Sequence, residues 1–62
     1  MTEGEVMEVL VQRCKNLGTV ARMDTAVMSH IAKRLASIPD MTAEKVMNAC
    51  KNPAAMLRYF PR

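Results

Sequence analysis

The sequence predicts an all-α fold of four helices, arranged as two successive antiparallel hairpins in a single small module over residues 1–62. Three observations predict this fold. Apolar residues recur at intervals of three and four along most of the chain. Residues that favour helix starts precede each of these stretches. Neither alternating apolar and polar residues nor an Asn-Gly or Asp-Gly turn indicates a strand.

The first helix is expected over residues 3–17. Thr2 and Glu5 have the spacing of a capping box, in which each side chain accepts a hydrogen bond from the other residue's backbone. Gly18 is expected to end the helix in the left-handed conformation that glycine favours. The apolar stripe of this first helix consists of Val6, Leu10, Cys14 and Leu17, with Met7 and Val11 at its edges.

The second helix is expected over residues 25–37, with Asp24 as its N-cap and Pro39 as its stop. Either Asp40 or Thr42 caps the third helix, over residues 43–51. The inward side chains of these two helices are expected to be Val27, Ile31, Leu35 and Ile38 in the second, and Ala43, Val46, Met47 and Cys50 in the third.

The fourth helix is expected over residues 53–59. Asn52 stands at its N-cap and Pro53 at its first position, where a missing N–H costs nothing. Pro61 ends the helix.

Composition limits what this module can be. The 62 residues include seven Met but one Tyr, one Phe and no Trp, so the core has few large side chains. The isolated chain is therefore expected to be marginally stable. Half of the residues are apolar and 24% are charged, which excludes an intrinsically disordered chain. No segment is apolar for long enough to span a membrane.

The charge is unevenly distributed. The net charge is +3, the first residues are acidic, and every charged residue after Glu44 is basic. This distribution predicts an anionic partner near the C-terminal half, because Lys and Arg that neutralise phosphates supply sequence-independent affinity. A solvated basic face is the alternative. Cys14 and Cys50 are expected to be two buried thiols in a reducing compartment, with a disulfide as the alternative.

Two short recurrences suggest an internal repeat. Cys14-Lys15-Asn16 returns as Cys50-Lys51-Asn52 after 36 residues, and Val6-Met7 returns as Val46-Met47 after 40. Periods of this length are typical of solenoids built from helical hairpins.

The stretch from Pro39 to Lys51 resembles the junction of two pentatricopeptide-type repeats. Pro39-Asp40 stands where one repeat closes, and a helix led by Thr42 with paired aliphatic residues opens the next. The region from Asp24 to Leu35 resembles the related heptatricopeptide type of organellar proteins that carry a RAP domain. The resemblance covers about residues 5–52. It implies an α-solenoid module, or a segment of a longer helical-repeat protein, that binds RNA or belongs to a mitochondrial ribosome or RNA-processing assembly.

The resemblance also implies which positions meet RNA. The base-reading places of such repeats hold Val9, Lys45 and Asp40 here, and Val9 and Lys45 depart from the Asn, Ser or Thr that read bases. Phosphate contact by Lys45 is therefore expected instead of a base code. Lys51, Arg58 and Arg13 are expected to contact phosphates as well. A cytoplasmic location is the alternative to the mitochondrion.

Two other functions use the same residues. Residues 31–36 followed by 42–46 resemble a helix-turn-helix unit, in which Lys45 and Asn48 would touch base edges of duplex DNA. A small protein-interaction subunit is the third possibility. Its partner would contact the C-terminal residues Met56, Leu57, Tyr59 and Phe60.

Catalysis is not expected. His30 is the only histidine, and neither it nor the cysteines have the spacing of a triad or a metal site. Gly4 and Gly18 stand alone, so no glycine-rich phosphate loop is present. No cofactor or metal is predicted.

Overall fold

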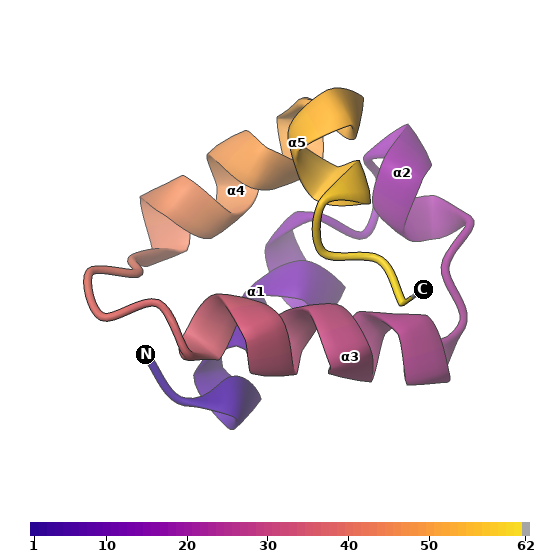
Figure 1. Cartoon of the computed structure of the whole chain (residues 1–62). Helices are drawn as coiled ribbons and strands as arrows, with labels where there is room; N and C mark the ends of the chain where they lie inside the picture. The colour runs from indigo at the N-terminus through magenta and orange to yellow at the C-terminus, as the bar shows by residue number, and fades with distance from the viewer. Residues whose placement is uncertain (62) are drawn as a thin grey trace.

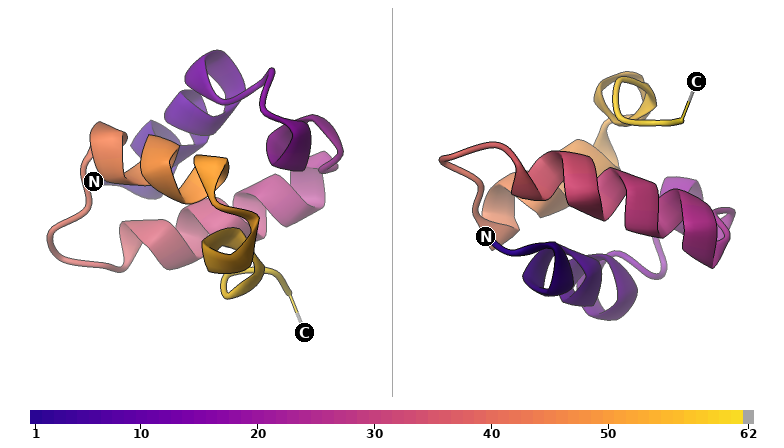
Figure 2. Two further views of the ribbon diagram at one scale, coloured as in Figure 1. Left: turned by 90° about the horizontal axis from the view of Figure 1, so that it is seen from above. Right: turned by 60° about the horizontal axis from the view of Figure 1, so that its bottom comes forward.

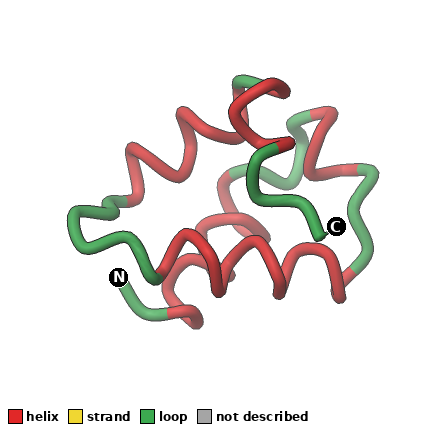
Figure 3. Tube along the Cα trace, viewed as in Figure 1, coloured by secondary structure: helices red, strands yellow, loops and turns green. Residues whose placement is uncertain are grey.

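The computed structural model describes residues 1–61, apart from the side chain of Thr19, and within that range the chain is helical with no strand. Loops join the helices directly (Figure 3). The all-α fold class is thereby confirmed. The helices are α1 (Glu3–Arg13), α2 (Gly18–Ala21), α3 (Thr25–Ala36), α4 (Ala43–Lys51) and α5 (Pro53–Leu57).

The start of α1 follows the predicted capping box. The backbone N–H of Glu5 donates to the Thr2 hydroxyl at 3.1 Å, and the Thr2 N–H donates to Glu5 Oε1 at 2.9 Å. Two of the backbone donors that a helix start leaves free are satisfied in this way.

The other three predicted starts are also confirmed. Asp24 accepts from the Val27 N–H at 2.8 Å at the start of α3. Thr42, rather than Asp40, caps α4 by accepting from the Lys45 N–H at 3.2 Å. The Asn52 side chain accepts from two N–H groups of α5, with Pro53 at the first helical position.

The first helix ends four residues earlier than predicted. It ends at Arg13, and Cys14 is its C-cap. The Cys14 N–H donates a hydrogen bond to the Val9 carbonyl at 3.2 Å. Leu17 takes extended angles, φ −77° and ψ 133°, which turn the chain into α2. The expectation of a left-handed Gly18 is also wrong: no glycine has positive φ, and Gly18 begins α2.

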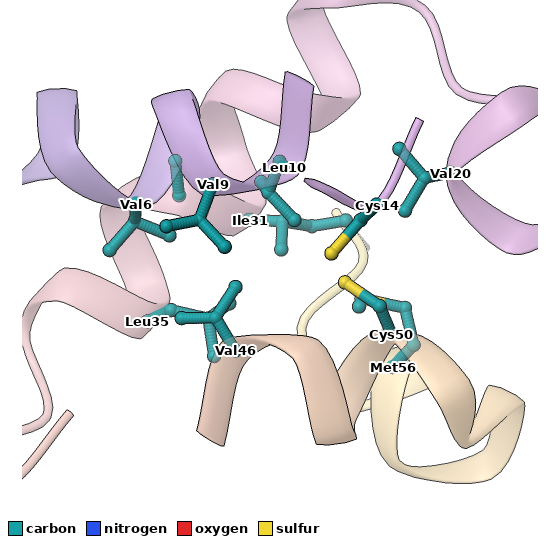
Figure 4. Packing of buried hydrophobic residues seen from close by; sticks show 11 residues of the cluster. Val6, Val9, Leu10, Cys14, Val20, Ile31, Leu35, Val46, Cys50 and Met56 are labelled. Carbon is teal, nitrogen blue, oxygen red and sulfur yellow. The ribbon is translucent and has the colours of Figure 1, made fainter. Parts of the chain in front are cut away.

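α2 was not predicted, because four residues are too few for a helical periodicity to appear. Its role in the fold is to bring Val20 into the core, where Figure 4 places Val20 beside Cys14. Had the first helix continued to Leu17, it would have carried this segment away from the core.

The last helix is also shorter than predicted. α5 ends at Leu57, and the chain continues in tight turns in which the Tyr59 N–H donates to the Met56 carbonyl at 3.0 Å. Such turns commonly satisfy the free carbonyls at a helix end. At the end of α3, Ser37 follows as the C-cap and its hydroxyl donates to the Arg34 carbonyl at 2.7 Å.

α1 is the central helix of the fold, since it packs against both α3 and α4. α3 runs back against α1, as Figures 1 and 2 show, which is the first predicted hairpin. α4 and α5 also contact each other. The radius of gyration is 10.0 Å, about the value of a compact domain of this length rather than of an extended array.

The core lies between α1, α3 and α4 and is closed by α2 and α5 (Figure 4). Its members are apolar side chains and two thiols, with no buried charge among the described residues. The predicted stripes supply most of them, whereas Val11, predicted at a stripe edge, is 45% exposed. The buried residues are Val6, Val9, Leu10, Cys14, Val20, Ile31, Ala32, Leu35, Val46, Cys50 and Met56.

Candidate nucleic-acid interface

Three of the predicted nucleic-acid-contacting residues lie together on the outer face of α4: Lys45 and Lys51, expected to meet RNA phosphates, and Asn48, expected to meet DNA bases. Lys45, Asn48 and Lys51 follow one another at intervals of three, so they form one ridge along the helix. All three are exposed, whereas Val46 and Cys50 on the opposite face are buried. This outer ridge, Lys45, Asn48 and Lys51, is called the α4 ridge below.

Lys45 is held in place at the start of the α4 ridge. Its Nζ donates a hydrogen bond to the Asp40 carbonyl at 2.9 Å, while its backbone N–H is bound by the Thr42 hydroxyl. An ammonium group has three donors, so two remain for a ligand. The positive end of the α4 dipole lies in the same turn and adds to the attraction for an anion.

The ridge is basic but not exclusively so. Glu44 is exposed in the first turn of α4, where a carboxylate stabilises the positive helix end. Two ammonium groups and an amide outnumber this one carboxylate. The face can therefore attract a phosphate chain without discriminating among bases.

Arg13 and Arg58 do not belong to α4: Arg13 is the last residue of α1, and Arg58 is the C-cap of α5. Arg13 ends α1 and lines a shallow hollow with the acidic Glu5 and Glu8, so two carboxylates oppose an anion there. Arg58 is exposed at the end of α5, which Asn52 joins directly to α4. Of the five predicted nucleic-acid contacts, the structure thus places three on one surface.

The base-reading position at Val9 is almost fully buried. Val9 is only 8% exposed and belongs to the core, because α1 turns this side chain toward α4 and α3. The pattern of the first predicted helix had placed Val9 outside its apolar stripe. The helix presents a wider apolar face than that stripe, and Val9 lies within it.

The predicted partner contact at the C-terminus requires a correction. Met56 is fully buried, so its side chain fills the core instead of meeting a partner. α5 turns Met56 inward to cover the end of α4, as Figure 4 shows. Leu57, the next residue, points outward and is 63% exposed.

The two aromatic residues fold back on α3. The Arg34 guanidinium lies 5.9 Å from the centroid of the Tyr59 ring, a cation–π distance. Phe60 lines a hollow with Met23 and Val27. Both rings are partly buried in this way, and Arg34, which the sequence did not single out, is the residue that holds Tyr59.

His30, the single histidine of the sequence, lies on α3 and is partly buried. The His30 Nε2 is buried without a hydrogen-bond partner among residues 1–61. Within the same residues, no group of three or more His, Cys, Asp or Glu side chains is placed to hold a metal ion. Nor does any helix there have the length and apolar character needed to cross a bilayer.

The relation of α3 to α4 bears on the helix-turn-helix interpretation. Residues 37–42 separate the two helices, and each packs more extensively against α1 than against the other. Helix-turn-helix units have a turn of three or four residues and hold their second helix directly on the first. The long connection and the sparse packing of α3 on α4 do not match such a unit.

Comparison with protein-family models, with curated proteins and with solved structures found no match for this chain. The interpretation of its surface therefore depends on the geometry described above.

Proposed function

We propose that this protein is a non-catalytic helical-repeat module that contacts the phosphates of single-stranded RNA through the α4 ridge. The observation that carries the proposal is the alignment of Lys45, Asn48 and Lys51 on one exposed helix face, with the Lys45 ammonium held by the Asp40 carbonyl. An anchored ammonium loses less side-chain freedom when it binds a phosphate, so more of the contact energy remains for affinity.

Binding through this ridge is expected to be independent of base sequence. Phosphate contacts position a protein on its ligand and carry no base information. Base stacking would require an exposed aromatic face, whereas Tyr59 is under Arg34 and Phe60 packs beside Val27. A flexible single strand can follow a curved helical surface, and the resemblance of residues 39–51 to RNA-binding repeats favours RNA over DNA.

The test is the affinity for an oligouridylate over a salt series, measured by fluorescence anisotropy. In the Lys45→Gln, Lys51→Gln double variant, the slope of log affinity against log salt should fall by about 1.4, because each phosphate contact to a single strand contributes about 0.7. A duplex DNA of the same length, measured in parallel, tests the helix-turn-helix alternative.

A matched control removes the same charge elsewhere. Lys15 and Lys33 are exposed on other parts of the chain, so the Lys15→Gln, Lys33→Gln variant has the same net charge without altering the α4 ridge. This control should retain the parent slope. If the slope fell equally in both variants, the net charge of the chain and not the α4 ridge would explain the binding. A parent protein that binds neither nucleic acid would refute the proposal.

The proposal extends to the assembly that contains the protein and to its cell compartment. The resemblance to organellar repeats leads us to propose a ribonucleoprotein partner in the mitochondrion. Cell fractionation with a C-terminal tag, followed by RNase treatment, tests both points. Co-sedimentation with a large particle that RNase dissolves is expected, and a cytoplasmic, RNase-insensitive distribution would contradict it.

Docking to another protein is a second candidate, favoured by Leu57. Its side chain is 63% exposed and follows the fully buried Met56, so α5 presents one large apolar group to the outside. A single exposed leucine is common on protein surfaces, whereas the α4 ridge unites three polar groups. RNA contact is therefore the function that we favour.

A further inference from the structure

The fold brings the two cysteines together from distant parts of the sequence. Cys14 follows the last residue of α1, Cys50 lies in the last turn of α4, and the two are 36 residues apart. Both are free thiols and are buried, with exposed fractions of 0% and 2%. In Figure 4 their sulfur atoms point toward each other across the interface between the two helices.

The two thiols also interact. Burial raises the pKa of the Cys50 thiol to about 12, and the Cys14 thiol adds to this rise through a hydrogen bond and through its charge. The raised pKa agrees with the position of the two labelled sulfur atoms in Figure 4. α1, which ends just before Cys14, packs against α4, which contains Cys50, so the proximity of the two thiols belongs to the folded state.

We propose that Cys14 and Cys50 are a redox modification site, which a low-molecular-weight disulfide such as glutathione disulfide converts into an intramolecular disulfide that clamps the end of α1 to the end of α4. The inference is independent of the proposed RNA binding. It uses only residues of the core.

The chemistry is two successive thiol–disulfide exchanges. One cysteine, as its thiolate, attacks a sulfur of the small disulfide; a protein–glutathione bond forms, the bond between the two glutathione sulfurs breaks, and the first glutathione leaves with the proton that the cysteine lost. The second cysteine then attacks the protein sulfur, forms the Cys14–Cys50 bond and releases the second glutathione with the second proton. The protein loses two electrons and two protons, and the oxidant gains both.

The two steps have different requirements. Because both thiols are buried and the thiolate is the nucleophile, the first attack requires a local opening at the ends of α1 and α4. The second attack becomes fast when these ends close again, since the fold returns one sulfur to the other. Oxidation should therefore be slow to begin and should accumulate little mixed disulfide.

The experiment equilibrates the whole chain in buffers of graded glutathione and glutathione disulfide, quenches with acid and determines masses. The expected product is the monomer lighter by two hydrogens, with glutathione adducts a minor fraction, and dithiothreitol should restore the starting mass. The thermal midpoint of the oxidised form should rise by about 10 to 20 °C, because a closed loop of this length restricts the unfolded chain.

Two controls test whether the disulfide forms because the fold brings Cys14 and Cys50 together. The same titration in urea, where the helices are separated, should lower the ratio of intramolecular to mixed disulfide by about tenfold or more. Cys14→Ala and Cys50→Ala should each stop at a single glutathione adduct, whether or not the variant folds. Adducts that dominate in the native chain, an unchanged ratio in urea, or an oxidised form that melts below the reduced one would each overturn the proposal.

Discussion

α1 and α4 begin with a similar pattern of residues but have different outer faces. A shift of 40 residues places the cap Thr2 on Thr42 and the fully buried Val6 on Val46. In both helices, the threonine hydroxyl accepts from the N–H three residues on, at 3.1 Å in α1 and 3.2 Å in α4. The inward half of the pattern is thus shared.

The outward half is not shared. The same shift places Glu5 and Glu8 of α1 on Lys45 and Asn48 of α4, and all four are exposed. Val11, also exposed, stands where α4 has Lys51. One ridge is therefore acidic and apolar, and the other is basic and polar.

Packing restricts the residue types at the inward positions of the two helices and leaves those at the outward positions free to differ. Inward positions must fill the core, so both helices have apolar residues there. Outward positions contact solvent, where most substitutions change stability little. The change from Glu5 and Glu8 to Lys45 and Asn48 at these positions is consistent with a difference in what the two faces meet, and it supports the proposed RNA contact at α4.

The largest expected loss of stability comes from shortening a buried side chain of α1. Leu10→Ala should destabilise the fold by about 2 to 5 kcal/mol, because it removes a fully buried side chain and leaves a cavity. For a domain with little stability to lose, this leaves the chain largely unfolded by circular dichroism at 25 °C. Val11→Ala, on the neighbouring and half-exposed position, should change stability by less than about 0.5 kcal/mol. Equal effects would mean that α1 does not face the core as described.

The two threonine caps should have comparable, smaller effects. Thr2→Ala and Thr42→Ala each remove the hydroxyl that accepts an N–H at the helix start, and each should cost about 1 kcal/mol. Urea denaturation of the two variants measures this directly. The serine variants, which keep a hydroxyl, should recover most of the loss. A large cost at one cap and none at the other would break the equivalence of α1 and α4.

The smallest expected effect is a pH dependence of stability that the start of α1 has and the start of α4 lacks. The Thr2 N–H, and then the Thr2 side chain, hydrogen-bond the Glu5 carboxylate and hold the pKa of Glu5 below its ordinary 4.5. A carboxylate with a lowered pKa in the folded state stabilises that state above about pH 4.5 and loses this contribution as pH falls through the lower value.

The measurement compares the urea midpoint of the parent and of Glu5→Gln between pH 6 and pH 2. The parent should lose slightly more stability on acidification than the variant, in which this position does not titrate. Lys45 occupies the corresponding place in α4, so Lys45→Gln should not alter the acid dependence. Parallel curves for the parent and Glu5→Gln would show that the capping box carries no charge-dependent stability.

The sequence predicted where helices begin better than where they end. Thr2, Asp24, Thr42 and Asn52 are short-range signals that act on backbone donors within three residues, so they can be recognised without the fold. The end of α1 depends instead on tertiary contacts. Cys14 and Val20 must both reach the core, and no local residue preference announces the turn between them.

The candidate site was predictable in the same uneven way. Lys45, Asn48 and Lys51 lie on one helix, and their spacing places them on one face. Arg13 and Met56 could not be judged from spacing, because the carboxylates beside Arg13 and the buried position of Met56 arise from contacts with other residues. The proximity of Cys14 to Cys50 likewise depends on the packing of α1 on α4.

The most direct test of the central claim maps RNA contact residue by residue. The isotope-labelled chain is titrated with a short oligouridylate while its backbone amide resonances are recorded. We predict saturable shifts that are largest at Lys45, Asn48 and Lys51, with the α1 positions Glu5, Glu8 and Val11 nearly unchanged. Shifts centred on α1, or no saturable shift at any amide, would contradict the assignment of RNA contact to the α4 ridge.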